Sequence, residues 1–263
     1  MKTRVISAAV ALALLVPCLV VWDTKAAEAI VGLVMAIGLF EFVRMATPDN
    51  LKSVVPLWLA GGGIYASALY WPQQGLHGAV VLAVALLLCW ALFFTETVEA
   101  GFQTAGKLLF GLGWVVVLGL HIPLLTTQWG MPYAVLLLLI VFAGDTGAYF
   151  VGRALGKRKL FERVSPKKTW EGVFGGLAAS VLITVLFAQQ KLPELEVVHC
   201  VVMALLVGSA GVTGDLIESM VKRACKVKDS GSIMPGHGGA LDRVDSLLMG
   251  APVMYLYLKH IAF

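Results

Sequence analysis

Long apolar runs occupy most of this chain and restrict it more than any other feature. They fall at residues 5–22, 27–46, 53–70, 76–95, 108–126, 131–151, 172–189, 196–217 and 245–259. Most of them approach the ~20 residues that an α-helix needs to cross about 30 Å of hydrocarbon. Only 14% of the residues are charged, against about 25% in soluble domains. The sequence therefore predicts an all-α, polytopic integral membrane protein with about nine transmembrane helices.

The distribution of positive charge gives the expected orientation. With nine helices and a cytoplasmic N-terminus, seventeen of the 20 Lys and Arg residues fall on the inner side, and Lys25, Lys191 and Lys259 fall outside. This bias is typical of membrane proteins. The first run follows Lys2 and Arg4 and also fits a signal peptide, but eight further runs follow it and no clean cleavage site does. We expect a retained first helix, a cytoplasmic N-terminus and a C-terminus on the far side.

Two connections, residues 152–171 and 218–245, are long, basic and on the same expected side. Basic cytoplasmic loops often only hold orientation or contact anionic lipid, but that does not explain the acidic residues mixed into these two. No internal repeat, low-complexity tract or soluble domain is evident. We predict one membrane domain over residues 1–263, with scaffold spans at 1–130 and catalytic spans at 131–263.

Asp145 is a carboxylate inside an apolar run. It lies in LLLLIVFAGDTGAYFVGR, toward the cytoplasmic end of the predicted helix. A carboxylate at the centre of a spanning helix costs about 2.5 to 3.5 kcal/mol on insertion scales, so intramembrane carboxylates are usually functional. The alternative is an interfacial residue that caps a broken helix between Gly144 and Gly147. We favour the functional interpretation.

Asp215 ends the apolar part of VGSAGVTGDLIESMVKR. Glu218, Ser219 and Lys222 follow at helical offsets of three, four and seven, so the four residues share one helix face. Glu218 and Lys222 fit an ordinary surface pair that contributes a few tenths of a kcal/mol. We expect Asp215 to point inward, because it is the deepest of the group and no basic residue lies one turn before it.

Asp242 and Asp245 begin the last predicted span and share one helix face. Acidic residues in a first helical turn complement the helix dipole. Two carboxylates that converge at ~4 Å, however, repel each other by about 4 kcal/mol at an effective dielectric constant of 20. A bound cation explains such a cluster better than dipole compensation does.

The chemistry of these side chains favours a hard cation. Carboxylate oxygens without paired His or Cys residues suit Mg²⁺, which one or two carboxylates typically hold together with substrate phosphates. The neighbouring basic residues are then candidate phosphate contacts, namely Lys167, Lys168, Lys222, Arg223, Lys228 and Arg243. Together they predict a site for phosphoryl or nucleotidyl transfer.

Of two glycine-rich stretches, only the second is a candidate for phosphate binding, and we reject the first. The stretch GRALGK, residues 152–157, lacks P-loop spacing and has Arg158 where Ser or Thr is required. In PGHGG, residues 235–239, the glycines allow backbone N–H groups to approach an anion. A plain turn is the alternative for that second stretch.

The polar segment at residues 219–246, SMVKRACKVKDSGSIMPGHGGALDRVDS, resembles the signature of the phosphatidate cytidylyltransferase (CDP-diacylglycerol synthase) family. The shared elements are Ser-x-apolar-Lys-Arg, Lys-Asp, Pro-x-His-Gly-Gly and Asp-Arg-apolar-Asp. Upstream, GDTGAYFVGRALGKRKL and SPKKTWEG are similar to the family in order and spacing. The resemblance covers about the C-terminal half of the chain. Met234 and Ala240 depart slightly, without removing a polar group.

The resemblance implies transfer of CMP from CTP to phosphatidic acid, which gives CDP-diacylglycerol and pyrophosphate in phospholipid biosynthesis. The second pKa of a phosphate monoester is near ~6, so the attacking phosphate needs no strong base. Positioning and charge neutralisation would supply the catalysis. We also expect a bacterial inner-membrane location, an active site that faces the cytoplasm, membrane lipid but no nucleic acid as a partner, and a homodimer.

The resemblance also implies roles for particular residues. Mg²⁺ is the expected ion, with room in the family for a second cation such as K⁺, and its ligands would be Asp145, Asp215, Asp242 and Asp245. Lys222 joins these four as a catalytic residue. The expected substrate contacts are Lys167, Lys168, Ser219, Arg223, Lys228, His237, Gly238, Gly239 and Arg243. For Arg243, a structural ion pair with a neighbouring aspartate is an equal alternative.

Three other functions compete with this hypothesis. The nearest is a related CTP-dependent transferase or kinase that acts on another lipid phosphate or alcohol. An ion-coupled transporter would use Asp145 and Asp215 to carry ions, but such proteins place charges at the midplane of broken helices and often contain repeats. A CDP-alcohol phosphotransferase would need a pattern of spaced aspartates that this chain lacks.

Overall fold

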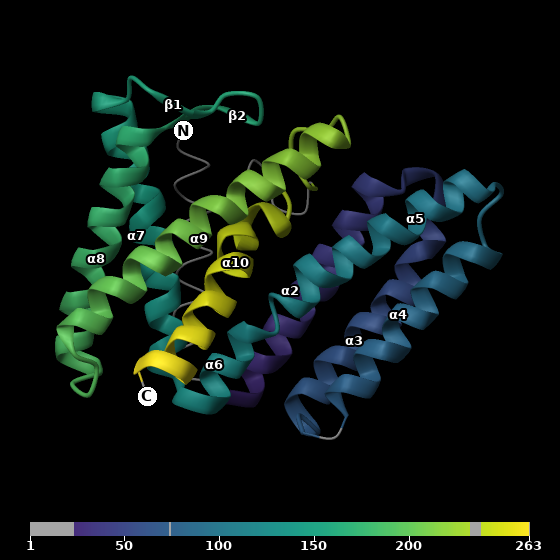
Figure 1. The fold of residues 1–263 in the computed structure, drawn as a ribbon, viewed down its shortest axis with the longest axis horizontal. Helices are drawn as coiled ribbons and strands as arrows, with labels where there is room; N and C mark the ends of the chain where they lie inside the picture. Colours follow the sequence, from purple (N-terminus) through teal and green to yellow (C-terminus); the bar gives the residue numbers. More distant parts are fainter. Residues whose placement is uncertain (1–23, 74, 232–237, 263) are drawn as a thin grey trace.

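The computed structural model describes residues 24–73, 75–231 and 238–262, so the first predicted helix lies outside the described residues. Helices dominate the fold (Figure 1). They are α2 (Thr24–Ala46), α3 (Val54–Tyr70), α4 (Leu76–Phe93), α5 (Val98–Gly111), α6 (His121–Trp129), α7 (Met131–Leu155), α8 (Trp170–Lys191), α9 (Val197–Ala224) and α10 (Leu241–Tyr257). Three shorter helical turns are η1 (Pro48–Ser53), η2 (Leu112–Val117) and η3 (Leu258–Ala262).

Seven helical segments in the described part of the chain are long and apolar enough to cross a membrane. They are Thr24–Ala46, Pro48–Tyr70, Leu76–Phe93, Val98–Trp129, Met131–Leu155, Trp170–Lys191 and Val197–Ala224. Each corresponds to one of the predicted apolar runs. The run predicted at 245–259 corresponds to α10, which has 17 residues and contains Pro252. A mostly helical protein with several candidate spans is thus confirmed, whereas the count of nine and the orientation stay predictions.

The two polar connections are shorter than predicted. Helix α7 continues to Leu155 and α9 continues to Ala224, because a helix does not have to end where its apolar run ends. Between α7 and α8 the chain forms an antiparallel hairpin of β1 (Lys159–Phe161) and β2 (Ser165–Thr169), with Lys159 opposite Thr169. The all-α prediction missed this hairpin, since its short, lysine-rich strands carry no hydrophobic alternation.

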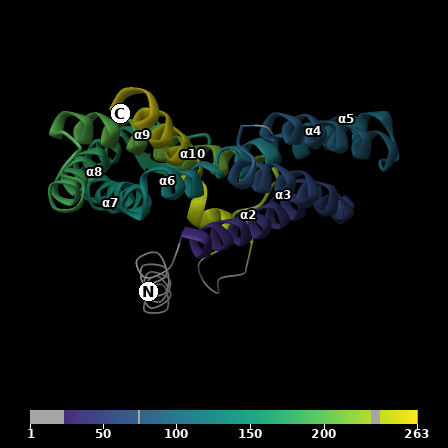
Figure 2. The same cartoon turned by 90° about the horizontal axis from the view of Figure 1, so that it is seen from below.

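The helices form two groups with α2 and α6 between them. Figure 1 shows α7, α8, α9 and α10 on one side and α3, α4 and α5 on the other, and Figure 2 gives the same division from a second direction. The hairpin, the last turn of α9 and the first turn of α10 lie at the same end of the bundle, the upper end in Figure 1. The two polar connections therefore lie at one end of the bundle, as expected for connections on one side of a membrane; which side that is stays a prediction.

Helix α10 connects two hydrophobic cores. Leu241 and Leu248 pack into a core with residues of α2, α3, α5 and η2, whereas Ala251 and Met254 pack into a core with residues of α7 and α9. All four of these side chains are buried. The position of α10 is therefore set by both groups of helices at once.

Small residues allow α7 and α8 to approach closely. A Cβ added at Gly176 would lie 2.6 Å from the carbonyl oxygen of Gly144, and one added at Gly147 would lie 2.7 Å from the carbonyl oxygen of Gly175. The Ser180 hydroxyl donates to the carbonyl oxygen of Ile140 across the same contact, at 2.8 Å. Close contacts of small residues, supported by interhelical hydrogen bonds, are typical of helix pairs in membranes.

We expect Gly176→Ala to destabilise the protein, because the new methyl group would overlap the backbone of α7. Overpacking of this kind typically costs about 1–3 kcal/mol. Gly63→Ala on the exposed face of α3 is the control, since no atom lies within 4 Å of its added Cβ. Thermal unfolding in detergent measures both variants. Equal melting temperatures would contradict the close packing of α7 and α8.

Candidate active site

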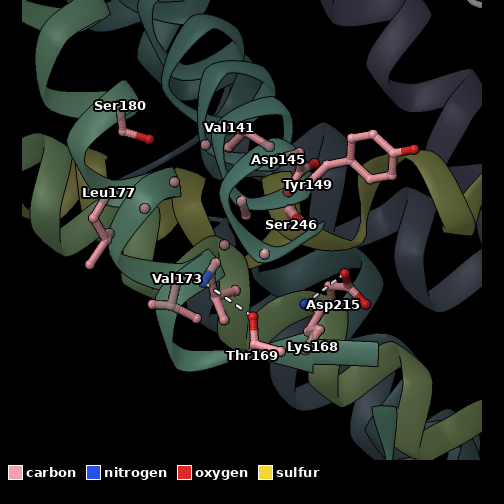
Figure 3. A pocket seen from close by; sticks show the side chains of 18 of the residues that line it. Val141, Asp145, Tyr149, Lys168, Thr169, Val173, Leu177, Ser180, Asp215 and Ser246 are labelled. Atoms are coloured by element: carbon pink, nitrogen blue, oxygen red, sulfur yellow. Dashed lines mark hydrogen bonds and ion pairs between the residues drawn. The ribbon is translucent and has the colours of Figure 1, made fainter. Parts of the chain in front are cut away.

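A cavity of about 470 Å³ lies between α7, α8 and α9, next to strand β2. Figure 3 shows Asp145, Tyr149, Lys168 and Asp215 on one side of this cavity and Val173 and Leu177 on another. Lys167 and Arg153 also line it, as do the apolar residues Ile140, Val141 and Val212. The cavity therefore offers charged groups and hydrocarbon surface to the same ligand.

Asp145 lies within α7 and reaches the cavity from that helix. The helix runs without a break from Met131 to Leu155, so the interpretation of Asp145 as the cap of a broken helix was wrong. Its carboxylate interacts electrostatically with Asp215 and with Lys168. Asp145 therefore belongs to a charged cluster with Asp215 of α9 and Lys168 of β2.

Asp215, on α9, binds a lysine from the hairpin. The Lys168 ammonium lies 2.7 Å from Asp215 Oδ2, and the Ser219 hydroxyl donates to Asp215 Oδ1 at 3.3 Å. Strand β2 leads directly into α8, where Thr169 Oγ1 accepts from the Gly172 N–H at 3.2 Å and caps the helix. The hairpin and this cap together bring Lys168 over α9.

Lys222 forms a second charged cluster, between α9 and α10. Its ammonium lies 2.6 Å from Glu218 Oε2 and 2.6 Å from Asp242 Oδ1. The pairing of Lys222 with Glu218 was predicted, but the prediction that this pair lies on the surface was wrong. Glu218 is only 1% exposed, because α10 packs over that face of α9. Its other oxygen, Oε1, has no hydrogen-bond partner among the described residues.

Both oxygens of Asp242 have partners. Oδ1 accepts from Lys222, and Oδ2 accepts from the Ser230 N–H at 2.9 Å, the Ser230 hydroxyl at 2.9 Å and the Gly239 N–H at 2.8 Å. Gly238 adopts a φ of 80°, which favours glycine. The backbone N–H of Gly239, predicted to face a substrate phosphate, donates instead to the carboxylate of Asp242.

Asp245 is buried one turn further along α10 and interacts with both charged clusters. It interacts electrostatically with Asp215 and Asp145 of the first cluster and with Glu218 and Lys222 of the second. Its Oδ1 accepts from the Ser246 N–H at 2.7 Å. Asp242 pairs directly with Lys222, whereas Asp245 interacts with Lys222 and Glu218 without a hydrogen bond to either among the described contacts. The structure brings Asp145, Asp215 and Asp245 into one electrostatic group, places Asp242 in the cluster around Lys222, and lets Asp245 connect the two.

A metal ion would need oxygen ligands from several of these carboxylates or from a substrate. In residues 24–73, 75–231 and 238–262, no three His, Cys, Asp or Glu side chains are arranged to hold a single ion. Mg²⁺ needs only one or two protein carboxylates when substrate phosphates complete its shell. Asp145 and Asp215 meet that requirement, because both line the cavity with oxygen ligands.

The remaining predicted substrate contacts fall into two sets. Lys167 is exposed at the cavity beside Lys168. Arg223, Lys228 and Arg243 are exposed at the same end of the bundle but are not among the lining residues, and the Arg223 guanidinium donates to the carbonyl oxygen of Val227 at 3.4 Å. His237 lies outside the described residues, so its role stays a prediction.

The sequence interpretation missed Glu41 on α2. This carboxylate is 1% exposed and accepts hydrogen bonds from the N–H groups of Ala240 and Leu241 and from the Ser230 hydroxyl. A signal was present, since Glu41 is a carboxylate within the apolar run 27–46 and such residues are usually functional. The same reasoning had selected Asp145.

Glu171 was missed as well. Its carboxylate accepts from the backbone N–H groups of Lys157 and Arg158, at 3.1 to 3.2 Å, and so connects the start of α8 to the chain that enters the hairpin. Its position two residues after Thr169 in the first turn of α8 was the available signal. Acidic residues there complement the helix dipole.

The chain is similar to known proteins over nearly its whole length, including the residues that line the cavity. A model of the Cytidylyltransferase family matches residues 2–261. Among similar proteins, the phosphatidate cytidylyltransferase of Pseudomonas aeruginosa is 36% identical over 262 residues (96% of this chain, 95% of the relative), and that of Haemophilus influenzae is 34% identical over 286 residues (98% of each). The phosphatidate cytidylyltransferase of Bacillus subtilis is 32% identical over 233 residues, or 85% of each chain. On this evidence the chain, with the charged cavity between α7, α8 and α9, belongs to the cytidylyltransferase family.

Proposed function

We propose that this protein transfers CMP from CTP to phosphatidic acid, with CDP-diacylglycerol and pyrophosphate as products. The observation that carries the proposal is the family match over residues 2–261, which includes every residue that lines the cavity. The relatives at 32 to 36% identity bear the name of this activity. The cavity supports it chemically, because a lipid phosphate needs charged contacts beside an apolar wall.

In the proposed reaction, a phosphate oxygen of phosphatidic acid attacks the α-phosphorus of CTP. One P–O bond forms there, and the bond from the α-phosphorus to the bridging oxygen breaks, so pyrophosphate leaves with that oxygen. Lys167 and Lys168 are placed to bind the phosphates, since both line the cavity. The attacking phosphate is largely ionised at neutral pH, with a second pKa near ~6. Positioning and charge neutralisation are therefore the tasks of the protein.

Asp145 and Asp215 are the residues that would hold Mg²⁺ in this proposal. The ion would neutralise charge on the phosphates of CTP. Asp245 would add negative charge beside this pair from α10, because its carboxylate interacts with both of theirs, and a bound cation would offset the repulsion among the three. Asp242 would orient Lys222, to which it is bonded at 2.6 Å. A second cation such as K⁺ stays a prediction.

The proposed setting is the inner membrane of a bacterium, with the cavity open toward the cytoplasm. Both polar connections lie at one end of the bundle (Figure 1), and that end carries most of the Lys and Arg residues between 152 and 245. We propose nine spans, a cytoplasmic N-terminus, a C-terminus on the far side, a homodimer, and a catalytic part at residues 131–263.

The direct experiment supplies the purified protein with CTP, Mg²⁺ and phosphatidic acid in detergent micelles. We expect CDP-diacylglycerol and pyrophosphate in equal amounts, measured by mass spectrometry and a phosphate assay, and no product after chelation of Mg²⁺. Diacylglycerol in place of phosphatidic acid is the control. Formation of phosphatidic acid from diacylglycerol and CTP, with no CDP-diacylglycerol in the main reaction, would instead identify a lipid kinase.

Asp145→Asn and Asp215→Asn should each lower kcat/KM by about 100-fold or more, the usual loss when an electrostatic contact to the transition state is removed. Each substitution keeps the shape of the side chain and removes its charge. Asp49→Asn is the matched control, because Asp49 is exposed in η1, outside the cavity. Full turnover in both cavity variants would rule out this pair as the metal site.

Gly211→Ala tests the placement of the lipid chains. Gly211 lines the cavity, and the nearest atom to an added Cβ is Ser246 Cβ at 3.6 Å, so the methyl group fits and fills cavity space. We expect the KM for phosphatidic acid to rise by about tenfold, as for one methyl group in an apolar pocket, with the KM for CTP unchanged. Gly106→Ala on α5, with no atom within 4 Å of the added Cβ, is the control. A higher KM for CTP alone would assign this wall to the nucleotide.

A further inference from the structure

We infer that Glu41, on α2, is a positioning residue for the active site, an inference that rests on the proposed function. Glu41 is buried, and its carboxylate accepts three hydrogen bonds from one segment of the C-terminal half. Oε1 accepts from the Ala240 N–H at 2.9 Å, and Oε2 accepts from the Leu241 N–H at 2.9 Å and from the Ser230 hydroxyl at 3.1 Å. These bonds join residues about 200 positions apart in the chain.

Glu41 supplies the cap that α10 lacks. The N-cap residue of α10, Ala240, has no side chain that can accept a hydrogen bond. The first N–H groups of a helix have no partner within the helix, and a carboxylate placed there also complements the helix dipole. The carboxylate of α2 therefore fixes the point at which α10 begins, directly before Asp242.

Ser230 links Glu41 to Asp242. Its hydroxyl oxygen lies 3.1 Å from Glu41 Oε2 and 2.9 Å from Asp242 Oδ2. A hydroxyl carries one proton, so Ser230 donates to one carboxylate at a time, while its backbone N–H stays bonded to Asp242. Because Asp242 also binds Lys222, direct contacts lead from Glu41 to the charged cluster between α9 and α10.

Two glycines show how closely the segment approaches Glu41. A Cβ at Gly231 would overlap Glu41 Oε1, and a Cβ at Gly239 would overlap both oxygens of Glu41. The backbone reaches the carboxylate only because these positions carry no side chain. Burial of a carboxylate is costly unless it is fully hydrogen-bonded, and this approach provides the bonds.

The test compares Glu41→Gln with Glu28→Gln, a control on the same helix whose carboxylate accepts only a long bond of 3.4 Å from Thr127 among the contacts described. A glutamine has one acceptor oxygen and an NH₂ group, so it cannot accept all three bonds of Glu41. We expect kcat per folded molecule to fall by about tenfold, with the KM for phosphatidic acid unchanged. A loss of folding alone would instead reduce the folded fraction and leave kcat per folded molecule unchanged.

Trypsin gives a readout that is independent of the reaction. Lys226 and Lys228 are exposed just before Ser230, and Lys157 and Lys159 are exposed in the hairpin connection. We expect Glu41→Gln to accelerate cleavage after Lys226 and Lys228 relative to cleavage at the hairpin. Should the unsubstituted protein make no CDP-diacylglycerol, the proposed function fails, and the cleavage rates still decide whether Glu41 holds the segment.

Ser230→Ala completes the test and covers the case in which Glu41→Gln does not fold. It leaves both N–H bonds to Glu41 in place and removes the contacts of the Ser230 hydroxyl with Glu41 Oε2, Asp242 Oδ2 and the Asp242 N–H. It should therefore lower kcat by itself. In the double variant, the two effects should be less than additive, because both act through one contact. Unchanged kcat and cleavage rates in Glu41→Gln, unchanged kcat in Ser230→Ala, or strict additivity would each overturn the inference.

Discussion

The contact on which the rest of the site depends is the one between Lys222 and the two carboxylates of Glu218 and Asp242, each at 2.6 Å. All three side chains are largely withdrawn from water, and a buried charge is costly unless it is paired and hydrogen-bonded. The ammonium group therefore fixes the first turn of α10 against α9. Removal of Lys222 would leave two buried carboxylates without their counter-charge, so the arrangement of α9 and α10 at this end allows little variation.

The close packing of α7 and α8 fixes another part of the site, the cavity beside these two helices. Glycines at positions 144, 147, 175 and 176 let the two backbones meet, and the hairpin that follows α7 carries Lys168 across to Asp215. One wall of the cavity is thus set by backbone contact and another by an ion pair. A pocket built in this way keeps its charged groups at one end and its apolar side chains along the helices, which suits a substrate with a phosphate and hydrocarbon chains.

The N-terminal half takes part in the site through Glu41. Predicted to be scaffold, it supplies the carboxylate that caps α10 and contacts Ser230. Helix α10 packs into the cores of both helix groups. A shift of α2 would therefore change the position of Asp242 at the start of α10. The N-terminal spans thus contact the segment that leads into α10, and the division into scaffold and catalytic spans stays a prediction.

The sequence by itself determined the membrane-type helices, the two polar connections and most of the charged residues of the site, because apolar runs and intramembrane carboxylates are local signals. Only the tertiary structure decided how those residues are grouped. Asp242 and Asp245 share a helix face, yet Asp242 pairs directly with Lys222, whereas Asp245 interacts electrostatically with charged groups of both clusters. Glu218 is a surface residue by its sequence pattern, but α10 covers it in the structure. The cap that Glu41 provides for α10 joins positions about 200 residues apart. Contacts of that range depend on how helices pack, and no local pattern of residues encodes them.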